Sequence, residues 1–531
     1  MSPPINPAGP GWRWLSPVLL LSIPTELLTA GRAGLWLLLL VFVAPLLALL
    51  LSPFPAPPAR NRLAGTLEAA LRLLMVGAIL WANLTLAGDV AFWMGGSRWS
   101  GVLIAGGGAV LLAALGEDER RRRLLGVLAL LGLAVPLLVV ALATDPVPPR
   151  VWSRVASQAA FRFPPDSPWV SEGRSVSGRR GAETLLFEEE HRLTPLTEGR
   201  MRVSTSDGRS VRDEELAVTP GRPVTVRPGD RLHLDGGTRF RFEAEKRIPG
   251  APVSGIAWAD APSRPRWPAL LRVLGVGVTL VGGAAALSVP GGARSRSGTA
   301  LLGLFLLAVV VWSECWALYG AAYAPELFLG GVTPEKLPEL PALVLRGEPS
   351  GHWLTWVALA GLLAGLLATA AALRQALTRT EPAASARARG PAMMEAGVAP
   401  ARGPAMMEAG VAPARAPAMI TEEIARDWRL WGGLVALAGV ASLWSHDAWM
   451  LLSLALGLGA STLAPLAVMG GRPRASAGAL AVGSTLFVGL AALGRLASAQ
   501  ANVVLSFPAL IAAPAAWGIL WLARRLSPEA E

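Results

Sequence analysis

Charged residues are scarce in this chain, at 16% of its 531 residues, against about a quarter in typical soluble domains. Long stretches carry no charge, and the charges gather in short islands between them. This pattern excludes an ordinary soluble domain, whose elements would show amphipathic periods. Each uncharged stretch runs roughly 17–24 residues, which suits a hydrocarbon core ~30 Å thick. The chain is therefore predicted to be an integral membrane protein, with the lipid bilayer as its first partner.

Cysteine and histidine are also nearly absent. The single cysteine, Cys315, excludes an internal disulfide and a cysteine-based zinc cluster. The chain has no phosphate-binding glycine loop and no nucleophile elbow. We therefore predict no cofactor, no metal and no catalytic residue of these classes. None of the four histidines pairs with another at a metal-ligand spacing, and they are His191, His233, His352 and His446.

Lysine occurs only as Lys246 and Lys336, so the net charge of +11 comes from arginine. Most arginines lie in short loops between apolar runs, where they orient helices in a membrane. No basic stripe is interleaved with aromatic residues, as a nucleic-acid-binding surface would require. We therefore predict no nucleic-acid partner.

The predicted fold is an α-helical polytopic membrane protein of about twelve spans, with an inserted mainly-β, sandwich-like extracytoplasmic domain. Whether the first span crosses the whole membrane is left open, because Pro24 and Glu26 interrupt it. The predicted spans are 14–31, 33–51, 64–87, 100–116, 124–143, 268–289, 299–321, 352–373, 430–446, 449–469, 476–495 and 502–523.

The tightest basic cluster, Arg120–Arg123, lies in the short loop between the fourth and fifth predicted spans. Short loops rich in arginine stay on the cytoplasmic side. Other arginine-bearing loops fall on the same side under a twelve-span count. We therefore predict a bacterial inner (plasma) membrane protein with both termini cytoplasmic and residues 145–267 periplasmic or extracellular.

Residues 145–267 are rich in charges of both signs and in turn residues. Apolar residues alternate between Pro-Gly-Asp and Asp-Gly-Gly turns, which predicts a mainly-β domain. The alternating residues are Val224 and Val226, Leu232 and Leu234, and Phe240 and Phe242. The run SDGRSV…VTVRPGDRLHL…FRF resembles the closing strands of forkhead-associated and similar small β-sandwich modules. The resemblance covers a small part of the chain and implies a sandwich-like fold without any ligand-reading residue.

The predicted organisation is five consecutive parts. A cytoplasmic flexible linker is among them, because ARGPAMMEAGVAP at Ala388–Pro400 is repeated without change at Ala401–Pro413. A proline-rich outer loop at 325–352 is expected on the membrane surface or against the β domain. The parts are 1–144 with about five spans, the β domain at 145–267, 268–376 with about three spans, the linker at 377–427, and 428–531 with about four spans.

Ionisable residues inside predicted spans are the first candidates for a binding site, because burying charge in lipid is costly. Glu68 and Arg72 stand four apart, so they can pair on one helix face, either as a neutralised pair near the membrane edge or as a polar site. Glu314 stands among aromatic residues, either in the outer interfacial belt or in a ligand or proton site. Glu26 belongs either to an interfacial segment or to a polar site.

Three further candidates stand at predicted span ends. Asp89 ends the third span, and His446 and Asp447 occupy a tight turn between two tryptophans. The turn pair is interpreted either as a helix cap or as a catalytic or metal pair.

The first functional hypothesis is a non-enzymatic envelope protein that anchors or assembles a complex through its extracytoplasmic β domain, where an envelope protein partner would bind. The second is a transporter or flippase for a lipid-linked or apolar substrate, with a cavity lined by Glu26, Glu68, Arg72 or Glu314. The third is a membrane-embedded lipid or glycan transferase that uses Asp89 or Asp447. The lack of a catalytic constellation favours a protein that is not an enzyme.

Overall fold

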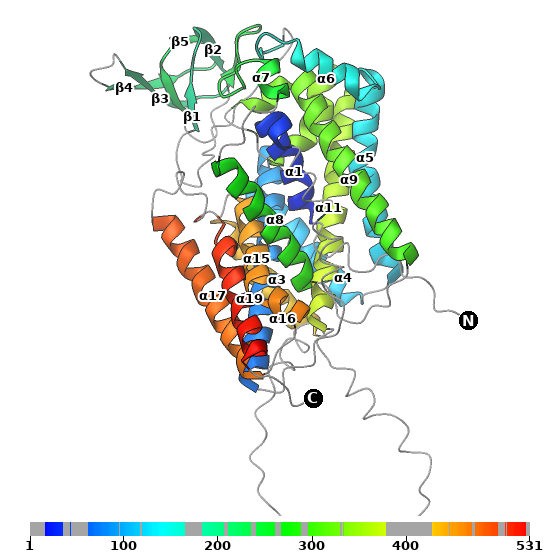
Figure 1. The fold of residues 1–531 in the computed structure, drawn as a ribbon. Coiled ribbons are helices and arrows are strands. Elements are labelled where there is room, and N and C mark those ends of the chain that lie inside the picture. The colour runs from blue at the N-terminus through cyan, green and yellow to red at the C-terminus, as the bar shows by residue number, and fades with distance from the viewer. Residues whose placement is uncertain are drawn as a thin grey trace, which may run out of the picture.

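The fold is taken from a computed structural model. It is mostly helical, with a small β region at one end of the helices (Figure 1). Among the residues that the structure describes, five helices are long and apolar enough to cross a membrane, which fits a membrane-embedded protein. The described residues are 16–34, 43, 62–94, 96–116, 119–164, 183–206, 211–234, 240–260, 267–287, 296–329, 332, 334–378, 427–444, 447–469, 473–496, 505 and 507–526.

Helices occur at every predicted span that the structure describes, and the span predicted at 33–51 lies almost entirely outside the described residues. Several begin at a side chain that accepts a hydrogen bond from the first turn, as Ser97, Asp427 and Asp447 do. The main helices are α1 (Pro17–Ala30), α3 (Arg62–Trp93), α4 (Arg98–Ala114), α5 (Glu119–Ala143), α8 (Trp267–Leu287), α9 (Arg296–Tyr323), α11 (Pro349–Thr378), α14 (Trp428–Ser442), α15 (Ala448–Ser461), α16 (Leu463–Met469), α17 (Pro473–Leu496) and α19 (Ala509–Arg525).

Shorter elements join these helices at the end that carries the β region. They are the 3-10 helices η2 (Gly31–Gly34), η3 (Pro325–Phe328) and η4 (Pro334–Glu339), and the short helices α6 (Pro148–Ala156), α7 (Gly255–Ala259) and α10 (Leu340–Val344).

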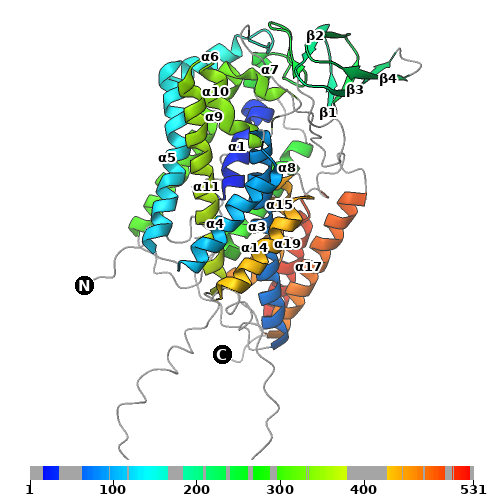
Figure 2. The same cartoon turned by 180° about the vertical axis from the view of Figure 1, so that it is seen from behind.

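Helix α3 packs against α4, α14 and α15 and also touches α11, α17 and η4. The last helices pack on earlier ones, α14 on α3 and α4, and α15 on α3 and α8. Figure 1 shows α15 beside α3 and α8, and Figure 2 shows α14 beside α3 and α4 from behind. The helices that follow the linker therefore belong to the same bundle as those that precede it.

Glycine lets two of the helix pairs approach closely. A Cβ on Gly132 of α5 would lie 2.3 Å from the Cα of Gly361 of α11, and a Cβ on Gly282 of α8 would lie 2.3 Å from the Cβ of Ala460 of α15. Small residues at such crossings bring backbones together where lipid supplies no hydrophobic drive for association.

Helix α1 covers only part of the thickness of a membrane, since its 14 residues rise ~21 Å against a hydrocarbon core of ~30 Å. It is buried on all sides except at Glu26 and its last two residues. Its first residue, Pro17, contacts Gly365 at the middle of α11, and Leu28 near its end contacts Gly320 of α9. Helix α1 therefore begins inside the bundle and ends near the β region.

The β region forms two antiparallel sheets, with strand orders β1-β6-β3-β4 and β5-β2-β7. Apolar residues of the first sheet, such as Leu185, Met201 and Leu232, are buried. The strands are β1 (Glu183–Leu186), β2 (His191–Pro195), β3 (Gly199–Ser206), β4 (Val211–Val218), β5 (Val224–Val226), β6 (Arg231–Leu234) and β7 (Phe240–Arg241).

The loop after α9 folds onto the bundle at the end that carries the β region; this end is named the outer end and the loop the outer loop. Its element η4 touches α1, α3 and α11, and Leu337 and Leu340 are completely buried. The Phe328 ring also lies 4.9 Å from the ring of Phe161, in the segment that leads to the β region. The expected contact with the β region is present, but the loop mainly caps helices, because its apolar residues find a buried place between them.

Candidate functional site

Asp89 forms a buried ion pair at the outer end of α3. Its carboxylate lies 2.8 Å from the guanidinium of Arg98, at the start of α4. Arg98 also donates hydrogen bonds to the backbone oxygens of Ser442 and Leu443, at the end of α14. Arg98 thereby satisfies carbonyl groups that the end of α14 would otherwise leave open. Asp89 thus belongs to a joint between three helices.

Glu68 and Arg72 pair near the opposite end of α3, as their spacing predicts. The two side chains are 2.8 Å apart and are 30% and 23% exposed. Arg72 also borders a cavity of about 10 Å³, which holds about one water molecule. The cavity lining is otherwise apolar, and it consists of Met75, Val76, Ala286, Ala376, Leu377 and Leu463.

Glu314 and Glu26 do not come together with the Glu68–Arg72 pair. Glu314 lies on the same face of α9 as Leu307 and Val311, which are about half exposed. Glu26 is partly buried near the outer end of α1.

Asp447 is the N-cap of α15, and its carboxylate accepts a hydrogen bond of 2.8 Å from the backbone N–H of Met450. This geometry is that of a helix cap. His446 lies outside the described residues, so the pair that the sequence suggests is seen only through Asp447.

Sequence reasoning missed a set of buried charges in the outer loop. Glu326 is completely buried and pairs with Arg346. Lys336 is 5% exposed, donates to the backbone oxygen of Leu329 at 2.7 Å and lies 5.4 Å from the centre of the Trp93 ring. No local signal marks them, because a proline-rich loop with charges is typical of an exposed connection. Together with Asp89 and Arg98 they make a polar layer at the outer end of the bundle.

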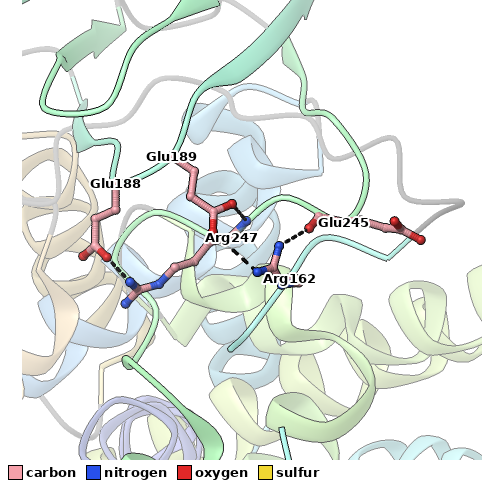
Figure 3. A network of polar contacts seen from close by, with 5 residues as sticks. All are labelled: Arg162, Glu188, Glu189, Glu245 and Arg247. Carbon is pink, nitrogen blue, oxygen red and sulfur yellow. Dashed lines mark hydrogen bonds and ion pairs between the residues drawn. The ribbon is translucent and has the colours of Figure 1, made fainter. Parts of the chain in front are cut away.

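A second polar network joins the β region to this end of the bundle (Figure 3). The segments around Phe163 and Lys246 pair antiparallel through a single bridge between Arg162 and Arg247, with backbone hydrogen bonds on either side of it. Glu189 accepts from the backbone N–H of Arg247 and lies 3.5 Å from Arg162, and Glu188 pairs with the Arg247 guanidinium. The network therefore links the segment that leads into the β region, around Arg162, to the segment that leads out of it, around Arg247.

His191 of β2 lies beside this network. Its ring packs edge-on against Phe187, with centres 4.9 Å apart, and against Phe163 at 6.3 Å. Burial lowers the pKa of His191 from its ordinary 6.5 to about 4, against the opposing pull of Glu189. The ring is therefore neutral at pH 7 and acts as part of the apolar core.

Asp89 and Glu326 are each held by an arginine, so these buried ion pairs link elements of the bundle. Within the described ranges, no three His, Cys, Asp or Glu side chains are grouped as a metal site requires. Comparison with known protein families finds no match, and comparison with curated protein sequences finds none.

Proposed function

We propose that the protein is a non-enzymatic scaffold of the bacterial inner membrane, which holds an envelope protein partner through its β region. The observation that carries this proposal is a hydrogen bond between α7, in the segment that leads out of the β region, and the buried helix α1. The indole N–H of Trp258 in α7 donates to the backbone oxygen of Leu28 at 2.7 Å, and both groups are buried. A domain fastened to the bundle core holds whatever it binds in a fixed place.

Further contacts support a rigid attachment. The Trp152 ring of α6 lies 5.5 Å from the Trp258 ring, and Phe161 packs on Phe328. Gly31 follows α1 with a positive φ, and a Cβ there would lie 2.1 Å from the backbone oxygen of Trp258. Attachment at several points opposes hinge motion between the β region and the helices.

The proposed topology has about twelve spans, cytoplasmic termini and a sandwich-like β region on the periplasmic side. It is supported by the position of the arginine-rich start of α5, which lies at the end of the bundle away from the β region (Figure 1). Positive-inside orientation places that end in the cytoplasm.

The proposed contact surface is the free edge of β4, at one end of the strand order. Asp213, Glu214 and Glu215 lie in a row there and are exposed. Charges on an edge strand oppose indiscriminate strand pairing and favour a partner of opposite charge. We therefore propose a partner with a basic surface.

Charge reversal on this edge tests the proposal. Full-length protein would be crosslinked in its native membrane and purified, as wild type and as the Glu214→Lys/Glu215→Lys variant. Arg429→Glu, an exposed change at the start of α14, is the control. Wild type and control should retain an envelope protein that the variant loses at least tenfold. Recovery of the same proteins from all three samples, or of none from wild type, would contradict the proposal.

The transporter alternative has weaker support. Of its four proposed cavity residues, Arg72 borders a space for about one water, while Glu314 lies on the half-exposed face of α9. The transferase alternative relies on Asp89 and Asp447, which are engaged as an ion-pair partner and as a helix cap.

A further inference from the structure

Hydroxyl side chains inside this bundle usually bond to their own helix. Thr25, Thr355 and Thr369 each donate to the backbone oxygen four residues earlier, and Ser461 and Thr462 do the same. A hydrocarbon environment supplies no water, so buried polar groups need a partner within the protein.

Asn83 of α3 departs from this pattern. Its side chain is 4% exposed, and within the described part of the chain neither its amide nitrogen nor its amide oxygen has a hydrogen-bond partner. An amide offers two donors and an acceptor, so an apolar surrounding leaves all of them unsatisfied. Such a group deep in a membrane bundle indicates a ligand or water beside it.

The face of α3 that carries Asn83 points toward α11. Val76, two turns earlier on that face, shares a cavity with Ala376 of α11. The two helices run in opposite directions, so Asn83 faces α11 about two turns nearer the β region, around Thr369 and Gly365. Gly365 is the residue against which Pro17, the start of α1, is packed.

Contacts of α4 give the same depth by another route. Leu84, next to Asn83, lies 3.7 Å from a Cβ built on Gly106, and Leu367 of α11 lies 2.9 Å from one built on Gly108. Gly106 and Gly108 lie within one turn of α4, so Asn83 and Gly365 lie at about the same depth in the bundle. The start of α1 packs on Gly365 and therefore lies at that depth too.

Helix α1 begins at this level with an extended N-cap, Ser16, which is completely buried. The Ser16 hydroxyl accepts from the N–H of Leu19 at 3.4 Å. Pro17 has no N–H and Ser16 holds that of Leu19, so Val18 supplies the remaining first-turn N–H at the positive end of the helix dipole, which favours hydrogen-bond acceptors and negative charge. An unpartnered amide and a helix N-terminus therefore share one depth near the middle of the bundle.

We propose that Asn83 and the first turn of α1 form a hydrated site inside the membrane bundle, which takes small solutes with hydrogen-bond-accepting, anionic groups such as carboxylate. The site is independent of the β region and of the scaffold function proposed above.

Cysteine accessibility tests the site in full-length protein. Cys315 is the only native thiol, so Cys315→Ala supplies a thiol-free background. In that background Asn83→Cys is compared with Leu84→Cys, its neighbour with the same 4% exposure. The probes are two methanethiosulfonate reagents of similar size, one with an anionic ethylsulfonate and one with a cationic trimethylammonium group.

Asn83→Cys should react at least tenfold faster than Leu84→Cys, and severalfold faster with the anionic reagent than with the cationic one. Ser16→Cys approaches the site from α1 and should show the same preference, even where Asn83→Cys does not fold. Rates equal to those of Leu84→Cys would show a dry interior and overturn the proposal. Equal rates for the two reagents would remove α1 from the site and overturn it as well.

Discussion

Neutralising Asp89 tests the buried ion pair at the outer end of α3. Asp89 and Arg98 are 6% and 14% exposed and lie 2.8 Å apart. Removing one partner of a buried pair leaves an uncompensated charge and costs about 3–5 kcal/mol. Arg98 would keep its two backbone carbonyl partners, on Ser442 and Leu443. We therefore expect Asp89→Asn to lower the free energy of unfolding by about 3 kcal/mol, at the lower end of that range.

Glu68→Gln is the matched control, because it removes the acid of another ion pair on the same helix. That pair is 30% and 23% exposed, and exposed pairs at this spacing contribute at most about 0.5 kcal/mol. The two changes are alike in chemistry and differ in burial, so the difference between them isolates the effect of burial.

Thermal unfolding of the full-length protein in detergent would measure both variants, with the fluorescence of its 20 tryptophans as the signal. Asp89→Asn should lower the unfolding midpoint by several degrees, while Glu68→Gln should leave it nearly unchanged. Equal midpoints for the two variants would refute the assignment of Asp89 to a structural joint.

Two further predictions concern helix packing and pH. Gly132→Val would push a side chain into Gly361 of α11, where even a Cβ lies 2.3 Å from backbone, so we expect a loss of about 3 kcal/mol in the same unfolding assay. Gly107→Ala, with no atom within 4 Å of the added Cβ, should be neutral, and equal stability of the two variants would refute the close crossing. Burial lowers the pKa of His191 to about 4 in the folded state, while the unfolded state keeps a pKa near 6.5. Between these two pH values the unfolded state binds a proton that the folded state does not bind, so the free energy of unfolding falls as the pH falls. The protection of the β2 amides against hydrogen exchange, corrected for the slower intrinsic exchange at lower pH, should therefore fall through this window by up to about 3 kcal/mol, and His191→Gln should show a smaller pH effect. An equal effect in both proteins would contradict a buried neutral ring.

Local sequence patterns predicted the elements that depend on local forces. Apolar length marked the helices, and alternation of Val224, Val226 and Leu232 marked strands of the β region. The Glu68–Arg72 pair follows from a spacing of four on one helix, and the cap at Asp447 follows from its place before an apolar run. The count of twelve spans and the sandwich arrangement stay predictions.

The hydrogen bonds and ion pairs that link distant elements could not be predicted from the sequence, because their two partners lie far apart along the chain. Arg98 bonds to carbonyl groups more than 340 residues away, and Trp258 bonds to Leu28 across 230 residues. Lys336 and Glu326 read as exposed loop charges until the loop is seen folded onto the helices. Among the described residues, the Asn83 side chain has no hydrogen-bond partner only because of the distant residues that surround it, which its place in the sequence does not show.

The sequence by itself indicated a membrane-embedded protein, and it determined which stretches form helices and where a β region interrupts them. These properties follow from hydropathy and periodicity, which act over one or two dozen residues. Only the tertiary structure decided that α1 begins inside the bundle, that the outer loop buries its charges and that the β region is fastened to α1. Each of these depends on which distant surfaces meet, and the free energy of such contacts depends on geometry that local composition does not encode.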